Sequence, residues 1–119
     1  MSDVNNLGAF GERLAFDFLI SEGYKILAQN YRFKKAEVDI LAQKGTYLVA
    51  VEVKTRRTNA FRAPEEFLKP AQIQRIIKAV DHFVISNDLN LEARFDIIAI
   101  VLSSKTPEID HIENAFYHF

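Results

Sequence analysis

The fold is decided by residues 37–55, which read EVDILAQKGTYLVAVEVKT. Their alternation and β-branched content predict two strands, Glu37 to Ala42 and Tyr47 to Thr55, joined by a turn that contains Lys44-Gly45. One face of the second strand is formed by Tyr47, Val49, Val51 and Val53. The other face is formed by Leu48, Ala50, Glu52 and Lys54. The sequence therefore predicts a β-hairpin with an apolar side and a side that carries charge.

The charged side chains of this hairpin are expected to meet on one face. Side chains two residues apart on a strand point the same way, so Glu37 and Asp39 share a face, and so do Glu52 and Lys54. If the turn holds an even number of residues, Asp39 lies opposite or diagonal to Glu52 on that face. Three carboxylates and one ammonium group then lie within several ångströms of one another.

Such a cluster favours a divalent cation. Two like charges repel by roughly 4 kcal/mol at 4 Å in an effective dielectric of 20, and a single Lys does not neutralise three acids. Magnesium accepts one or two carboxylates, keeps several waters and bridges to phosphate oxygens. Lys54 is placed to orient or deprotonate an attacking water. The alternative is an ordinary exposed ion pair between Glu52 and Lys54 on a plain sheet surface.

The remaining elements predict an α/β sandwich with a mixed sheet. A helix containing Leu7, Phe10, Leu14 and Phe18 at helical spacing is expected to end at Gly23. It carries Glu12 on a largely apolar face, where a carboxylate needs a partner. The further expected elements are a strand from Tyr24 to Phe33, a helix from Pro70 to Ser86, a strand from Arg94 to Leu102 and an edge strand from Glu108 to Phe116.

Length and composition predict one domain over residues 1–119. The chain has no Cys, which excludes disulfides, thiolate metal sites and a Cys nucleophile. The N-terminal sequence lacks the pattern of a signal peptide, and no apolar stretch is long enough for a bilayer. We therefore expect a cytoplasmic protein that makes no membrane contact.

Positive charge is concentrated in the middle of the chain. Residues 32–78 hold eleven of the fifteen Lys and Arg but only five of the sixteen acids. Such a segment can bind a polyanion although the whole chain is nearly neutral, because the field near a patch depends on local charge. The alternative is a solvated surface with a chance cluster of cations.

The hairpin motif, residues 37–39 (EVD) followed by residues 51–57 (VEVKTRR), resembles the PD-(D/E)xK nuclease superfamily. The resemblance implies a restriction-endonuclease-like three-layer sandwich with the core order α-β-β-β-α-β. It also implies that an Asp and the Glu of the Glu-x-Lys triplet hold Mg²⁺, with Mn²⁺ as a substitute, while the Lys serves the attacking water.

More narrowly, the chain is similar to the YraN-like family, whose members are predicted endonucleases related to Holliday-junction resolvases. The resemblance rests on the hairpin together with residues 11–15 (GERLA), 23–24 (GY), 64–66 (PEE) and 94–96 (RFD). It implies catalytic roles for Glu12, Asp39, Glu52 and Lys54, and a further metal ligand in the backbone carbonyl of Val53. Glu37 is a possible accessory acid of the same face.

Several residues outside the hairpin are candidates for nucleic-acid contacts. Arg56, Arg57 and Arg62 follow the hairpin and are suited to phosphate binding, since most protein–DNA hydrogen bonds go to the backbone. A solvated loop is the alternative for each of them. Gln72, near the start of the second helix, stands where the family usually has Lys. Asp96 is expected to cap its strand or pair with Arg94, and His111 and His118 show no metal-ligand spacing.

Three functions are compatible with these features. The leading hypothesis is a magnesium-dependent endonuclease that hydrolyses DNA phosphodiester bonds, in branched or otherwise structured DNA. The second is a nucleic-acid-binding module of nuclease fold with weak or no catalysis, and the third is a protein-interaction scaffold. Either a monomer or a homodimer fits, the dimer by analogy with junction resolvases of this fold.

Overall fold

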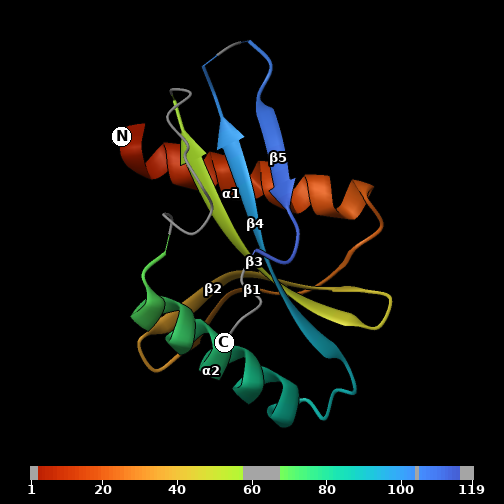
Figure 1. The fold of residues 1–119 in the computed structure, drawn as a ribbon. Helices are drawn as coiled ribbons and strands as arrows, with labels where there is room; N and C mark the ends of the chain where they lie inside the picture. The colour runs from red at the N-terminus through yellow and green to blue at the C-terminus, as the bar shows by residue number, and fades with distance from the viewer. Residues whose placement is uncertain (1–2, 58–67, 104, 116–119) are drawn as a thin grey trace.

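The computed structural model describes residues 3–57, 68–103 and 105–115 (Figure 1). Along this part of the chain the elements are α1 (Asp3–Ser21), β1 (Lys25–Phe33), β2 (Ala36–Lys44), β3 (Tyr47–Arg56), α2 (Pro70–Ser86), β4 (Glu92–Val101) and β5 (Glu108–Ile112). The predicted order of helix, three strands, helix and strand is confirmed. The expected edge strand follows as β5, but it ends at Ile112, before the predicted end at Phe116.

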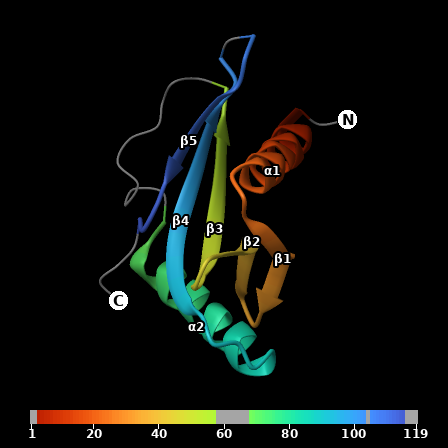
Figure 2. The same cartoon turned by 90° about the vertical axis from the view of Figure 1, so that its right-hand side faces the viewer.

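The five strands form one mixed sheet in the order β1-β2-β3-β4-β5. Neighbouring strands are antiparallel except β3 and β4, which are parallel. Parallel neighbours need a crossover connection, and α2 lies in the segment that joins them. Figure 2 shows α1 and α2 on opposite sides of the sheet, so the architecture is the expected three-layer sandwich.

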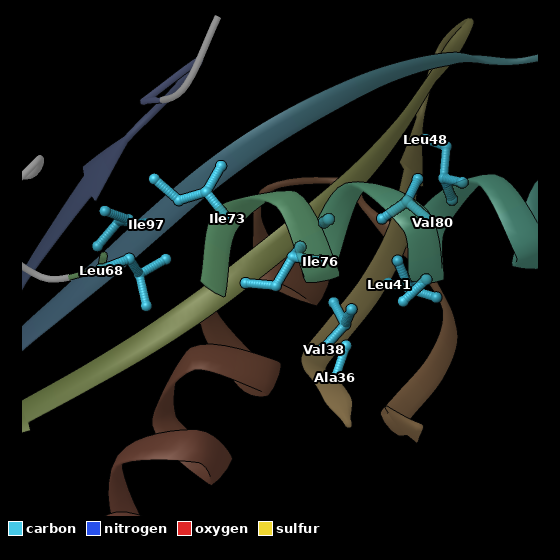
Figure 3. Close-up of a cluster of buried hydrophobic side chains, with 11 residues drawn as sticks. Ala36, Val38, Leu41, Leu48, Leu68, Ile73, Ile76, Val80 and Ile97 are labelled. Atoms are coloured by element: carbon cyan, nitrogen blue, oxygen red, sulfur yellow. The ribbon is translucent and has the colours of Figure 1, made fainter. Parts of the chain in front are cut away.

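Each face of the sheet has its own hydrophobic cluster. On the α1 face the buried side chains are Ala15, Leu19, Tyr24, Ile40, Ala42, Val49, Val51, Ile98 and Ile100. On the α2 face they are Ala36, Val38, Leu41, Leu48, Ala50, Leu68, Ile73, Ile76, Ala79, Val80 and Ile97 (Figure 3). The run Ile97–Val101 of β4 is buried throughout, as expected of a strand covered on both sides.

The C-terminal end of α1 and both ends of α2 lie where the sequence predicts. Gly23 adopts φ +90°, its N–H bonds the carbonyl of Ile20, and the Tyr24 N–H bonds the carbonyl of Leu19, which closes the last turn of α1. Pro70 occupies the first turn of α2, where a missing N–H costs nothing. Neither described helix is both long and apolar enough to span a membrane.

The contact between α1 and β3 is close at one point. A Cβ added to Gly11 would lie 1.8 Å from Oγ1 of Thr55 and 2.9 Å from its Cβ. Gly11 is therefore the residue that lets the helix approach the buried end of β3. In contrast, a Cβ added to Gly8 on the same helix would meet nothing within 4 Å.

We predict that Gly11→Ala destabilises the protein by about 1–3 kcal/mol, because the new methyl group overlaps Thr55 and forces α1 outward. Gly8→Ala is the matched control. It should leave stability unchanged or raise it by up to about 1 kcal/mol, because Ala is the better helix former. Urea unfolding of both variants measures the difference. Equal stabilities for the two variants would contradict the close packing at Gly11.

Candidate active site

The β2–β3 hairpin sets the relation between Asp39 and Glu52. Lys44 pairs with Tyr47, so the turn holds two residues, Gly45 and Thr46, and Gly45 has φ +58°. The even turn required by the sequence prediction is therefore present. The last ladder pair is Ile40 with Val51, and the same register continued by one residue sets Asp39 opposite Glu52.

β2 and β3 separate at Asp39. From there a side chain of β2, and no longer its backbone, accepts the hydrogen bond from β3. The N–H of Val53 donates to Oδ2 of Asp39 over 2.8 Å. Val38 packs in the α2-face cluster, whereas Ile40, two residues on, packs in the α1-face cluster. The strict alternation expected for β2 is therefore wrong at this point, because the strand twists where its pairing with β3 ends.

The neighbouring strand β1 shows a matching distortion. Gln29 pairs with Ile40 and Tyr31 with Val38, so Asn30 lies across from Asp39. Asn30 adopts φ +51°, a left-handed conformation that Asn tolerates better than most residues. The bend in both strands carries the first half of β2 away from β3 and leaves a space beside the two acids.

Asp39 and Glu52 line a cavity of about 260 Å³ between the sheet and α2. Its other lining residues are Lys35, Ala36, Glu37, Gln72, Arg75 and Ile76. Gln72, near the start of α2, thus lines the same cavity as the carboxylates. Arg75, one turn further along α2, was not among the predicted site residues, although its i+3 spacing from Gln72 is a signal for a shared helix face.

The pKa values of both acids are raised. Burial raises the pKa of Glu52 to about 8, with the negative charge of Asp39 as the second cause and Lys54 acting in the opposite direction. Burial also raises the pKa of Asp39, against the lowering effects of the Val53 N–H and of Lys54. Two half-buried carboxylates thus face each other with too little positive charge to balance them.

Lys54 acts on Asp39 and Glu52 through its electrostatic field. It lies two residues after Glu52 on β3, across from Ala99 of β4, and lowers the pKa values of both acids. Within the described residues its ammonium group makes no direct ion pair. It is therefore held near the carboxylates and remains available to a ligand.

Glu12 approaches the pair from the other face of the sheet. Burial raises its pKa first, followed by the negative charges of Asp39 and Glu37. It lines a separate hollow of about 610 Å³ together with Asn30 and residues of α1. Because Gly11 brings the helix against β3, the adjacent Glu12 is carried toward the acids of the hairpin.

Glu37 has only part of the expected role. It lines the carboxylate cavity and adds negative charge to Asp39, but it also forms an ion pair of 2.8 Å with Arg32. The Arg32 side chain is 80% exposed, so this pair is a weak surface interaction. The exposed Arg32 thus partly neutralises Glu37, whereas Asp39 and Glu52 have no such ion pair among the described residues.

The arginines after the hairpin lie apart from this cavity. Arg56 ends β3 and Arg57 follows it, and neither lines the space around the carboxylates. Four residues of extended strand separate Arg56 from Glu52, a distance of about 13 Å. Arg62 falls outside the described residues, as do residues 64–66 and His118.

The donor set fits a hard divalent cation. Asp39 and Glu52 offer carboxylate oxygens in one polar cavity, and Asp39 is fixed in place by the Val53 N–H. Oxygen ligands of this kind suit Mg²⁺ and Mn²⁺, whereas the lack of Cys excludes a thiolate site. Burial raises both pKa values, and the negative charge of Asp39 raises that of Glu52 further; a bound cation would offset this cost of the charged forms.

A second polar cluster lies in the first half of β4 and on β5. Asp96 is 1% exposed and accepts hydrogen bonds from Nε and Nη2 of Arg94, from Nε2 of His111 and from the N–H of Asn114. Burial opposes the charged form of Asp96, but these bonds outweigh it and lower its pKa. The predicted Arg94–Asp96 pair is confirmed.

His111 was not expected to join this cluster. It pairs with Ile98 across β4 and β5, which sets it diagonal to Asp96. Asp96, His111 and Glu113 place ligand atoms within 4.8 Å of one another, as a metal site would. However, the guanidinium of Arg94 already contacts Asp96 at 2.8 Å and Glu113 at 3.1 Å, so this cluster is closed by its own cation.

Comparisons with known proteins agree on one family. Residues 11–100 match the family described as uncharacterised protein family UPF0102. A UPF0102 protein of Flavobacterium psychrophilum is 56% identical over 119 residues, and one of Christiangramia forsetii is 50% identical, each with both chains fully covered. A UPF0102 protein of Thermodesulfovibrio yellowstonii is 39% identical, over 93% of this chain and 96% of its own.

The raised pKa of Glu52 predicts that the site destabilises the fold at alkaline pH. The unfolded chain releases this proton near pH 4.5 and the folded chain near 8, so stability is lost as pH rises between these values. Glu52→Gln removes the charge. We expect it to be more stable than wild type at pH 9 by about 1–3 kcal/mol, with little difference at pH 4.

Urea unfolding at both pH values in the presence of EDTA measures this effect, with EDTA removing divalent ions that would offset the charge. Glu108→Gln, an exposed acid on β5, is the matched control and should show no such gain. A gain for Glu52→Gln of the same size at pH 4 and pH 9 would contradict the electrostatic origin.

Proposed function

The chain belongs to UPF0102, the YraN-like family of PD-(D/E)xK nuclease type, and from this premise and the carboxylate site we propose that it is a magnesium-dependent endonuclease that hydrolyses DNA phosphodiester bonds. One observation carries the proposal. Asp39 and Glu52 stand at opposite positions of a hairpin in a polar cavity, with Asp39 anchored by a backbone N–H and Lys54 two residues beyond Glu52.

Asp39, Glu52 and the backbone carbonyl of Val53 are the groups that would hold the metal ion. A bound Mg²⁺ supplies a water of lowered pKa and offsets the negative charge that develops on the phosphoryl oxygens. Asp39 is suited to metal binding because the Val53 N–H holds its Oδ2. This hydrogen bond fixes the orientation of the whole carboxylate, Oδ1 included.

Lys54 acts on the attacking water. Its ammonium group lies close enough to the two acids to lower their pKa values, and it makes no direct ion pair with a described residue. It orients the attacking water and stabilises the negative charge that develops on the phosphate. Glu12, with its raised pKa, adds a further carboxylate from the α1 side.

The substrate is DNA, in a branched or otherwise structured form. Gln72 lines the cavity from α2 and is positioned to donate to a phosphate oxygen beside the carboxylates. The arginines at the end of β3 contact the backbone further from the scissile bond. The polyanion is drawn to this region by the excess of Lys and Arg in residues 32–78.

Metal binding is the first test. We expect Mn²⁺ or Mg²⁺ to raise the melting temperature of the wild-type protein, because the ion binds the folded site and relieves its charge. Asp39→Asn and Glu52→Gln should lose this response, whereas Asp110→Asn, a matched exposed acid on β5, should keep it. Calorimetric titration at pH 8 gives the affinity. A rise of equal size in all four proteins would show that the ion binds elsewhere.

Cleavage is the second test. Wild-type protein should cut a labelled four-way DNA junction in Mg²⁺ and not in EDTA. Asp39→Asn, Glu52→Gln and Lys54→Met should each reduce the rate by a factor of about 100 or more, since each removes a group in contact with the reacting atoms or the metal. Asp110→Asn should cut at the wild-type rate.

Two outcomes of this assay contradict the proposal. A wild-type protein that binds the junction but leaves it intact in Mg²⁺ and Mn²⁺ would be the nucleic-acid-binding module considered from sequence. Full activity in Asp39→Asn or Glu52→Gln would place the chemistry, if any, at another site.

A further inference from the structure

A second cavity of about 260 Å³ adjoins the carboxylate cavity, and its charge has the opposite sign. Its lining residues are Phe33, Lys34, Lys35, Ala36, Arg75 and Lys78. We name it the basic cavity. Four of its six lining residues are cationic and none is acidic. Within the described residues, none of these four cations forms an ion pair.

The two cavities are adjacent. Lys35, Ala36 and Arg75 line both of them, so the basic cavity begins where the carboxylate cavity ends. Lys78 follows Arg75 by one helical turn on α2 and extends the cationic surface away from Asp39 and Glu52. A ligand that spans the border meets acids on one side and cations on the other.

The lysines of the basic cavity sit on a constrained turn. Phe33 pairs with Ala36, so Lys34 and Lys35 form the two-residue turn between β1 and β2. Lys34 has φ +57°, in the left-handed region where such turns favour Gly, Asn or Asp. A lysine at this position is locally unfavourable, and it points to a use for the charge that is independent of folding.

The turn is also fixed against α2. The hydroxyl of Tyr31 and Nδ1 of His82 are hydrogen-bonded at 2.6 Å, and the His82 ring stacks on Phe33 with centroids 4.2 Å apart. These contacts hold the end of β1 on the helix that carries Arg75 and Lys78. The cationic groups are therefore held together from two elements before any ligand binds.

We propose that the basic cavity binds a backbone phosphate of DNA next to the one that is cut. The inference rests on the proposed function and adds the path of the DNA strand, which runs from the carboxylates along α2 toward Lys78. The phosphate is held by Lys34, Lys35, Arg75 and Lys78, and the Phe33 side of the cavity packs on the sugar. The paired cavities match a ligand whose metal-bound phosphate is followed by a second anionic phosphate.

Binding in EDTA tests this inference separately from cleavage. The probe is a fluorescein-labelled four-way DNA junction, and its anisotropy is measured over a series of salt concentrations. Lys35→Gln, Arg75→Gln and Lys78→Gln should each weaken binding several-fold and lower the salt slope by about 1, as loss of a phosphate contact does. Lys25→Gln and Lys105→Gln, exposed lysines outside the cavity, should bind like wild type.

Lys34→Gly separates binding from folding. Gly adopts a positive φ without strain, so this variant should unfold at the same or a higher urea concentration than wild type. It should nevertheless bind the junction several-fold more weakly. A variant that is at least as stable yet binds less well cannot owe its defect to a damaged fold.

The results for the two proposals are distinguishable. Variants of the basic cavity that bind like Lys25→Gln overturn the phosphate site, even if the wild-type protein cuts DNA. Selective weakening by these variants, in a protein that never cuts DNA, supports the phosphate site and rejects the endonuclease. A wild-type protein that does not bind the junction in EDTA at low salt overturns the phosphate site as well.

Discussion

The hydrogen bond from the N–H of Val53 to the carboxylate of Asp39 is the interaction on which the site depends. Where β2 leaves β3, the backbone donor of Val53 would otherwise lose its ladder partner, and a buried donor without a partner is costly. The side chain of Asp39 replaces the missing carbonyl. The strands can therefore separate without an orphaned group, and the anchored carboxylate stands opposite Glu52 at the border of a cavity.

The helices complete the site from both faces of the sheet. On one face, Gly11 lets α1 approach Thr55, and this contact carries Glu12 toward the hairpin acids. On the other face, α2 supplies Gln72 and Arg75 to the carboxylate cavity. The sheet supplies Asp39 and Glu52 to this cavity beside the polar and cationic groups of α2, whereas Glu12 lies in a separate hollow on the α1 side. Because α2 packs on the sheet face that carries the acids, the cavity between them has charges of both signs.

The elements and the position of the hairpin acids could be predicted from sequence because they depend on local pattern. Strand alternation and an even turn suffice to set Asp39 opposite Glu52. The same alternation fails between Val38 and Ile40, where the twist results from loss of pairing with β3. The His111 contact with Asp96 depends on the register between β4 and β5, which no local pattern encodes.

The two polar clusters of the described chain differ in whether they are complete. Asp96 is buried, yet Arg94, His111 and the Asn114 N–H satisfy it, and its pKa is lowered as a result. Burial raises the pKa values of Asp39 and Glu52, and the field of Lys54 does not outweigh it. A buried cluster that is balanced internally serves the fold. An unbalanced cluster beside lysines without ion pairs to described residues lowers stability. We propose that a metal ion bound to a polyanion balances both the acids and the lysines.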